Sequence, residues 1–302
     1  DNHMTIKDLL SHQSGLTYGF SQKTEVDKAY RERGIGRMES LHTNQTLEDM
    51  INLLSEVPLE FSPGSSWNYS VSTDVLGYLI ELISGKSFDT FLKERIFKPL
   101  NMNDSGFYVP ESKLSRFAAN YIFNEGKESG QSISLINQDT KESGPPILIE
   151  DPMISPYSKN PTFFSGGGGL VSTIDDYLNF CIMLLNKGSY KNHQILSEKT
   201  INLMTNNHIT DKKDLLETAS GRWAETTYAG IGFGLGFQIL LDPVKSQIIS
   251  SKGEYGWGGA ASTVFWIDPK EDLITIFLTQ LVPSSAYNIR RELRTLVYSS
   301  IN

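Results

Sequence analysis

The feature that most limits the fold is a stretch of strict alternation near the C-terminus. Residues 231–239 read IGFGLGFQI, so large apolar side chains take every second position and small or polar residues fill the positions between them. Because successive side chains of a strand point to opposite faces, this period of two predicts one β-strand over the whole stretch. The glycine-rich face would be nearly bare backbone, which another element could approach closely.

Two further apolar segments complete a predicted antiparallel sheet. The segments 259–267 (GAASTVFWI) and 273–281 (LITIFLTQL) flank a turn at 268–272. The second segment is apolar at nearly every position, as expected for a strand that is covered on both faces. A closing helix is predicted around 289–297, where apolar residues recur on one side. Residues 228–302 are therefore expected to form a three-stranded meander followed by a helix.

Helical signals dominate residues 1–227. Segments that begin near Thr5, Thr46 and Thr173 each carry an aspartate three residues after the threonine, which is the pattern of an N-terminal cap. Another helix follows residue 70 and stops at Gly85. The polar piece 124–146 predicts a surface excursion or hairpin. Helices packed on an antiparallel sheet give an α+β fold, and we expect residues 1–302 to form one domain.

Composition and spacing exclude several classes of function. The chain has 302 residues, a net charge of −8 and no cluster of Lys or Arg, so we expect no nucleic-acid partner. No apolar run approaches the length of a membrane span. The five histidines show no paired spacing, so we expect no metal and no cofactor. The single cysteine, Cys181, lies on an apolar helical stripe and is predicted to be a core residue.

Two polar motifs have simple structural explanations. His12 and Ser14 suggest a serine-hydrolase pair, but no GxSxG motif surrounds them, so we interpret Ser14-Gly15 as a helix stop. The run 166–169 is all glycine and precedes a helix, as a phosphate-binding loop does. It lacks the lysine of such a loop, and we expect a tight structural turn instead.

Two other segments carry the strongest chemical signal. Tyr69 stands at the start of an amphipathic helix in 67-WNYSVSTDVLG-77. Taken alone it is more often a core or rim aromatic than a base, because the phenol has a pKa of about 10. In 254-EYGWGGAASTVFW-266, glycines come directly before a predicted strand. Such glycines let a substrate lie against backbone N–H groups, which an oxyanion hole requires.

Four segments in this order resemble the serine β-lactamase and penicillin-binding-protein-like hydrolases, and most of all the class C-type branch with the family VIII carboxylesterases. The segments are 4–20, 66–107, 165–180 and 255–280, and together they span nearly the whole chain. The resemblance implies a β-lactamase/transpeptidase-like fold, in which the active site lies between a helical region and an antiparallel sheet.

The resemblance also implies roles for individual residues. Tyr69 takes the place of the general base that moves a proton between the nucleophilic serine and the leaving group. The backbone N–H of Ala260 takes the place of one oxyanion donor. The other residues of the two motifs would contact the substrate; these are Ser70, Val71, Trp257, Gly258 and Gly259.

Two departures from the family pattern favour a small ester substrate. Val71 stands where the family has asparagine, and Trp257 stands where lactamases and peptidases have lysine or histidine. Both changes remove polar groups that grip a β-lactam or a peptide, and both resemble the esterase branch. A carboxylic ester is therefore the expected substrate, and weak β-lactam hydrolysis stays open.

The third departure is the absence of a Ser-x-x-Lys motif, because no serine here is followed by lysine three residues later. We expect this nucleophile upstream of residue 1, on a lost or separate N-terminal fragment. The chain alone would then be inactive, with an open sheet edge and an unfilled core. The alternative is a non-catalytic binding or regulatory module that has no nucleophile.

Overall fold

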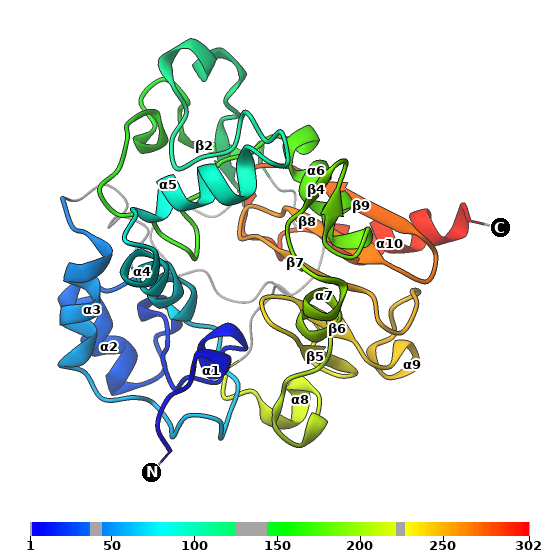
Figure 1. The fold of residues 1–302 in the computed structure, drawn as a ribbon, viewed down its shortest axis with the longest axis horizontal. Coiled ribbons are helices and arrows are strands. Elements are labelled where there is room, and N and C mark those ends of the chain that lie inside the picture. The colour runs from blue at the N-terminus through cyan, green and yellow to red at the C-terminus, as the bar shows by residue number, and fades with distance from the viewer. Residues whose placement is uncertain (1, 37–43, 125–143, 222–226, 302) are drawn as a thin grey trace.

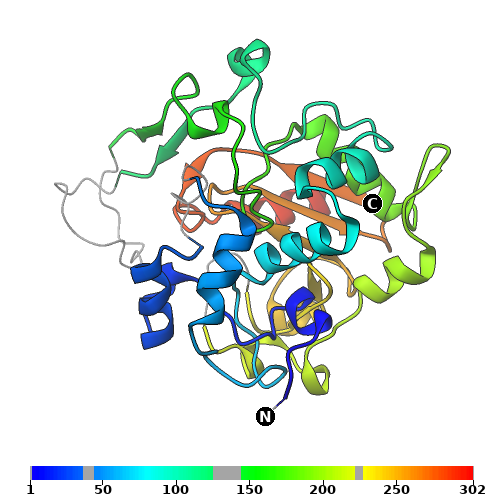
Figure 2. The ribbon, with the colours of Figure 1, turned by 60° about the vertical axis from the view of Figure 1, so that its left-hand side comes forward.

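Two regions lie side by side in the computed structural model, which describes residues 2–36, 44–124, 144–221 and 227–301. Helices from the first part of the chain form one region, and a five-stranded antiparallel sheet forms the other (Figure 1). In the turned view, the cyan helices α4 and α5 lie in front of the orange strands (Figure 2).

The helices and 3₁₀ or π turns are α1 Ile6–Leu10, η1 Gly19–Ser21, α2 Glu25–Arg33, α3 Leu47–Ser55, α4 Ser72–Ser84, α5 Phe88–Leu92, η3 Lys93–Phe97, η4 Glu111–Arg116, η5 Pro156–Ser158, α6 Ile174–Leu185, α7 Glu198–Met204, η6 Thr210–Lys212, α8 Leu215–Thr218, α9 Pro243–Ser246 and α10 Ile289–Ser299.

The predicted helix caps are confirmed. The hydroxyls of Thr5 and Thr46 each accept a hydrogen bond from the backbone of the aspartate three residues later, which closes a capping box, and Thr173 caps α6. Helix α2, which uses the same box at Thr24, was not predicted. Its sequence EVDKAYRER is mostly charged, so its apolar side is too narrow to show a clear period.

The predicted strand over 231–239 is wrong, because the chain turns back within it. Strands β5 (Ile231–Phe233) and β6 (Gln238–Leu240) pair as an antiparallel hairpin. The turn is closed by a 2.7 Å hydrogen bond from the Gly234 N–H to the carbonyl of Phe237, and Gly236 has a φ of +98°. That left-handed conformation is the reason for a glycine at this position.

The predicted meander is part of a larger sheet with the order β5-β6-β7-β8-β9. Strand β7 (Tyr255–Gly258) lies outside the strands that periodicity predicted, although the family resemblance assigns Trp257-Gly258-Gly259 to a strand. Strand β8 (Val264–Asp268) begins later than expected, since residues 259–263 connect the two. Strand β9 (Leu273–Phe277) lies at the edge, and all five of its residues are only half-buried. The expected cover on both faces is therefore wrong for the described part of the chain.

A second, three-stranded sheet has the order β10-β1-β2 and was not predicted. Strand β1 (Asn120–Ile122) pairs in parallel with β10 (Leu281–Val282) and antiparallel with β2 (Ile147–Glu150). Most of the predicted excursion at 124–146 lies outside the described residues. The chain also forms a short hairpin of β3 (Ser189–Tyr190) and β4 (His193–Gln194).

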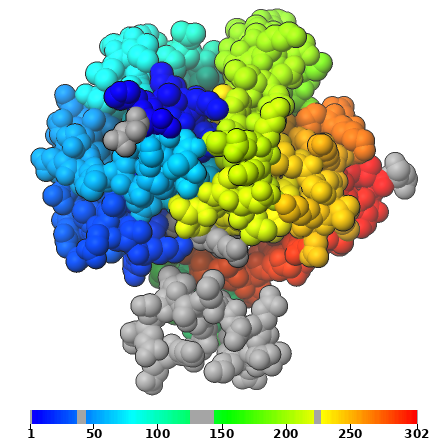
Figure 3. All heavy atoms as spheres, turned by 90° about the horizontal axis from the view of Figure 1, so that it is seen from below, coloured from blue at the N-terminus to red at the C-terminus, as the bar shows by residue number. Residues whose placement is uncertain are grey.

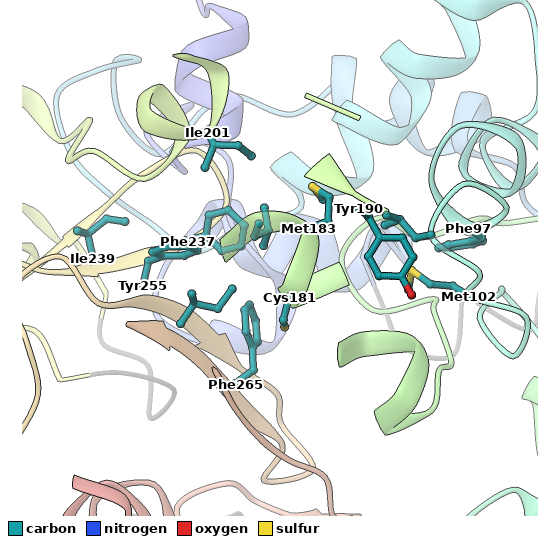
Figure 4. Packing of buried hydrophobic residues seen from close by; sticks show 13 residues of the cluster. Phe97, Met102, Cys181, Met183, Tyr190, Ile201, Phe237, Ile239, Tyr255 and Phe265 are labelled. Atoms are coloured by element: carbon teal, nitrogen blue, oxygen red, sulfur yellow. The ribbon is translucent and has the colours of Figure 1, made fainter. Parts of the chain in front are cut away.

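Three clusters of buried side chains hold these elements together. One lies among the N-terminal helices, the second between α6 and the sheet, and the third around Trp67 and strands β5 and β6. Figure 4 shows Cys181 beside Phe265 in the second cluster. Cys181 is fully buried, which confirms its prediction as a core residue, and burial raises the pKa of its thiol to about 12.

The third cluster joins the two regions, because Trp67 precedes α4 in the chain but packs on Phe233 of β5, with ring centroids 5.6 Å apart. In the space-filling view from below, the blue-to-cyan and yellow-to-red halves meet along one boundary (Figure 3). None of the described helices has the length and apolar character needed to span a membrane. The one-domain organisation stays a prediction.

Candidate active site

Tyr69 lies at the junction of the two regions. The residues on either side of it hydrogen-bond to a buried loop at 11–19: the N–H of Asn68 donates to the carbonyl of His12 at 2.9 Å, and that of Val71 donates to the carbonyl of Thr17 at 3.2 Å. These bonds fix the backbone on both sides of the tyrosine. Tyr69 itself is half-buried.

The structure brings Tyr69 together with the glycine-rich strand. Its ring lies 5.4 Å from the ring of Trp257 on β7, measured between centroids, with an angle of 39° between the planes. Trp257 also meets Phe233 of β5 edge to face, at 5.4 Å and 86°. The two motifs that carry the predicted chemistry are therefore in contact, although they come from different regions of the fold.

Tyr18 is a neighbour of Tyr69 that sequence reasoning did not single out. The two rings have centroids 5.2 Å apart. Burial, followed by the nearby Tyr69 and Asp74, raises the pKa of Tyr18 well above its usual value. Tyr18 thus stays protonated at pH 7.

A chain of hydrogen bonds runs beneath Tyr69. The Nδ1 of His12 lies 3.2 Å from the Ser70 hydroxyl, which lies 2.8 Å from the Ser72 hydroxyl, and Ser72 lies 2.7 Å from the hydroxyl of Ser14. Burial lowers the pKa of His12 from 6.5 to about 3, so the imidazole is neutral at pH 7. The His12 ring also packs on the Tyr69 ring at 4.9 Å.

This arrangement corrects the interpretation of Ser14-Gly15 as a helix stop. Helix α1 ends earlier, at Leu10, and is capped by Ser11. Gly15 has a φ of +85°, and a Cβ there would lie 2.4 Å from the carbonyl oxygen of Phe61, so its role is close packing of the buried loop.

Ser70 and Val71 lie under the surface. Both are fully buried, with 0% exposed area. In the described structure they support the segment that bears Tyr69. Their contact with a substrate stays a prediction.

The glycine run at 166–169 forms the expected tight turn, and it packs on the start of α4. The N–H of Gly167 and the hydroxyl of Ser165 donate to Oδ1 of Asp74, at 3.2 and 2.5 Å. Burial is the largest cause of the raised pKa of Asp74. A Cβ on Gly167 would lie 2.6 Å from the Tyr18 hydroxyl oxygen, so the glycine lets the turn close behind the tyrosine pair.

The connection between β7 and β8 presents the predicted oxyanion donor. It is closed by hydrogen bonds from the Gly259 N–H to the carbonyl of Thr263 at 3.0 Å and from the Ser262 N–H to the carbonyl of Gly259 at 3.1 Å. Ala260 is exposed, and its N–H donates to no acceptor among the described residues. The N–H is thus available to a ligand, as the predicted role requires.

A cavity of about 370 Å³ borders the Tyr69 segment at Asn68. Its wall includes Thr17 and Phe20, and Phe20 stacks on Tyr18 with centroids 4.6 Å apart. This volume is typical of a small-molecule pocket. The wall of this cavity does not include Tyr69, Trp257 or Ala260.

Residues 1–299 match the model of the Beta-lactamase family. The chain belongs to this family. MT1414 of Mycobacterium tuberculosis (strain CDC 1551 / Oshkosh) is 33% identical over 92% of this chain and 62% of its own length. Esterase EstB of Burkholderia gladioli is 27% identical over 91% of this chain and 64% of its own length. The chain thus spans less than two thirds of these relatives.

The solved structures of this family confirm the predicted fold class. The structure of EstCE1, described as a hydrolase with promiscuous acyltransferase activity, superposes with a TM-score of 0.76 and 27% identity over 98% of this chain and 72% of that chain. The α+β, β-lactamase/transpeptidase-like fold is therefore established. The relatives include a protein described as an esterase.

Proposed function

We propose that this chain forms part of a serine acyl-transfer hydrolase that acts on carboxylic esters. The observation that carries this function is the contact between Tyr69 and Trp257, at 5.4 Å between ring centroids. It sets a potential proton-transfer group beside the strand that leads to the Ala260 N–H, which donates to no acceptor in the described part of the chain. No serine of the 302 residues is followed by lysine three positions later. The nucleophile is then a Ser-x-x-Lys serine outside these residues.

Residues of this chain would supply the proton transfer and the oxyanion donor, and the nucleophilic serine would come from outside it. The Tyr69 phenolate accepts the proton of the nucleophilic serine, whose oxygen attacks the ester carbonyl carbon. The Ala260 N–H donates to the oxyanion that develops. As the intermediate collapses, Tyr69 returns the proton to the leaving alcohol, and water then releases the acid by the same route.

The surroundings of Tyr69 support an ester more than a β-lactam or peptide. Trp257 offers an aromatic face where lactamases and peptidases have a cation, and Val71, which is apolar and fully buried, presents no amide to the site. EstB, one of the relatives, is an esterase. An uncharged ester needs neither of the missing polar groups.

Tyr69→Phe in the full-length gene product tests this function. It removes the hydroxyl but keeps the ring, so kcat for p-nitrophenyl butyrate should fall about 100-fold or more, as for loss of a positioned acid/base. Tyr78→Phe, on the half-buried side of α4, is the matched control and should keep near-normal turnover. Full activity of Tyr69→Phe would remove Tyr69 from the mechanism. A folded full-length protein that hydrolyses neither esters nor β-lactams would instead indicate the binding or regulatory module.

A further inference from the structure

Arg290, at the start of α10, reaches the connection between β7 and β8 from behind. Its Nη2 donates to the carbonyl oxygen of Gly259 at 2.8 Å and to that of Thr263 at 3.0 Å. The guanidinium packs directly on the backbone of Gly258, where a Cβ would lie 2.5 Å from its Cζ. Glycine at 258 therefore makes room for the arginine as well as for a substrate.

The carbonyl of Gly259 and the N–H of Ala260 belong to one peptide group. That group is planar and trans, so its N–H points away from its carbonyl oxygen. The Gly259 oxygen accepts two hydrogen bonds, from Arg290 at 2.8 Å and from the Ser262 N–H at 3.1 Å. Two donors use both lone pairs of the oxygen. Holding the oxygen in this way also fixes the direction of the Ala260 N–H.

The charge of Arg290 adds a second effect. A hydrogen bond from a cation is stronger than a neutral one, and donation to a carbonyl polarises the peptide group. The polarised group carries more positive charge on its N–H. Arg290 thus makes the Ala260 N–H a better donor to a developing oxyanion without touching the substrate.

Helix α10 holds Arg290 at a fixed distance from this connection. One turn further along, Arg294 pairs with the buried Glu254 at 2.9 Å, and its guanidinium lies 4.4 Å from the ring centroid of Trp266 on β8. The Tyr298 hydroxyl also donates to Asp268 at the end of β8, at 2.9 Å. The helix is therefore anchored to the strands on both sides of the connection, as a positioning group requires.

We infer that Arg290 is a positioning residue for the oxyanion donor: it clamps and polarises the Gly259–Ala260 peptide group from the side opposite the substrate. The catalytic consequence rests on the proposed ester hydrolysis. The clamp itself does not, because it is a property of the peptide group in the resting protein.

The kinetic test compares Arg290→Met and Arg290→Lys with Arg291→Met in the full-length protein. Methionine keeps much of the apolar stem but has no donor, so kcat for p-nitrophenyl butyrate should fall about 10- to 100-fold with KM little changed, which is less than loss of a whole oxyanion donor. Lysine restores a charged donor and should recover part of kcat. Arg291 is the matched control, because it is exposed and bonds to the carbonyl of Gln247 instead.

A second readout reports the clamp whether or not the enzyme turns over. In protein labelled with ¹⁵N-alanine, the amide proton of Ala260 should move upfield in Arg290→Met and stay in place in Arg291→Met. If the wild type hydrolyses no ester, the proposed function fails while the amide shift still decides the clamp. Normal kcat in Arg290→Met, or lost kcat with an unmoved Ala260 resonance, overturns the inference. If Arg290→Met fails to fold, the kcat and the Ala260 amide shift of Arg290→Lys test the inference in its place.

Discussion

Two buried polar networks support the two halves of the site, and they differ in electrical character. The network under Tyr69 is neutral, since it consists of an uncharged imidazole and three hydroxyl groups. The network behind the β7–β8 connection is ionic, since the Glu254 and Arg294 side chains, 3% and 6% exposed, form a salt bridge there. The first network lies beneath the segment that carries Tyr69, and the second anchors α10, whose Arg290 bonds to the carbonyl of Gly259.

Because one network is neutral and the other is ionic, we expect the two halves of the site to lose stability under different conditions. A buried ion pair is costly to break from one side, because the remaining charge is left without a partner. A protein with a buried neutral imidazole becomes less stable in acid, because the imidazole binds a proton in the unfolded chain but not in the folded one. Single substitutions and pH can therefore separate the two networks.

The largest expected effect comes from the ionic network. Glu254→Gln keeps the shape of the side chain but leaves the buried guanidinium of Arg294 uncompensated, so the free energy of unfolding should fall by about 3 kcal/mol. Glu292→Gln, on the exposed side of the same helix, should change it by less than about 0.5 kcal/mol. Urea denaturation of the three proteins measures the difference. Equal stability of both variants would show that the pair does not anchor α10.

The next effect is the pH dependence of the neutral network. The pKa of His12 is about 3 when folded, against a usual value of 6.5, so its contribution to stability is complete above pH 6.5 and is lost as the pH falls toward 3. Between pH 7.5 and pH 5 the loss should be about 2 kcal/mol. Urea denaturation at the two pH values should show this loss in the wild type and a smaller one in His12→Asn.

His193→Asn is the control for this titration, because His193 is exposed on β4 and its variant should keep the wild-type pH dependence. NMR titration of the wild type gives a direct check that needs no variant. The His12 ring should stay unprotonated down to about pH 4. Protonation of His12 near pH 6.5 would contradict the buried, neutral assignment.

The smallest effect is expected inside the neutral network. Ser70→Ala removes one hydroxyl and leaves both His12 and Ser72 short of a partner, which should lower the free energy of unfolding by about 1 kcal/mol. Ser285→Ala, at an exposed position, should have almost no effect. Thermal unfolding compares the two variants. A loss as large as that of Glu254→Gln would erase the distinction between the networks.

Sequence patterns predicted the parts of the fold that depend on residues close together in the chain. The caps at Thr5, Thr46 and Thr173 were predictable because each involves only a threonine and an aspartate one turn later. The hairpin within 231–239 was not predictable, because apolar residues alternate without interruption through the turn that contains Gly236. Strands β1 and β10 pair across a long separation in sequence, which no short pattern can show.

The same distinction applies to the residues of the candidate site. Tyr69 and Trp257 could be singled out because their motifs resemble those of a known family, and the structure places the two rings in contact. Tyr18 contacts Tyr69, and Arg290 bonds to the carbonyl of Gly259. Both contacts join residues far apart in the sequence, and neither residue belongs to a recognisable motif. The resemblance predicted an oxyanion-donor role for the Ala260 N–H, whereas nothing in the sequence predicted the cation behind its peptide group.

The contact between Trp257 and Tyr69 also gives the protein a built-in optical label. Among the tryptophans that the structure describes, Trp67 and Trp266 are fully buried, whereas Trp257 is partly open to solvent. A collisional quencher in the solvent reaches Trp257 far more readily than the other two. The phenol of Tyr69 also lies well within range for energy transfer to the indole of Trp257. Fluorescence of that indole therefore reports directly on the space where the two regions of the fold meet.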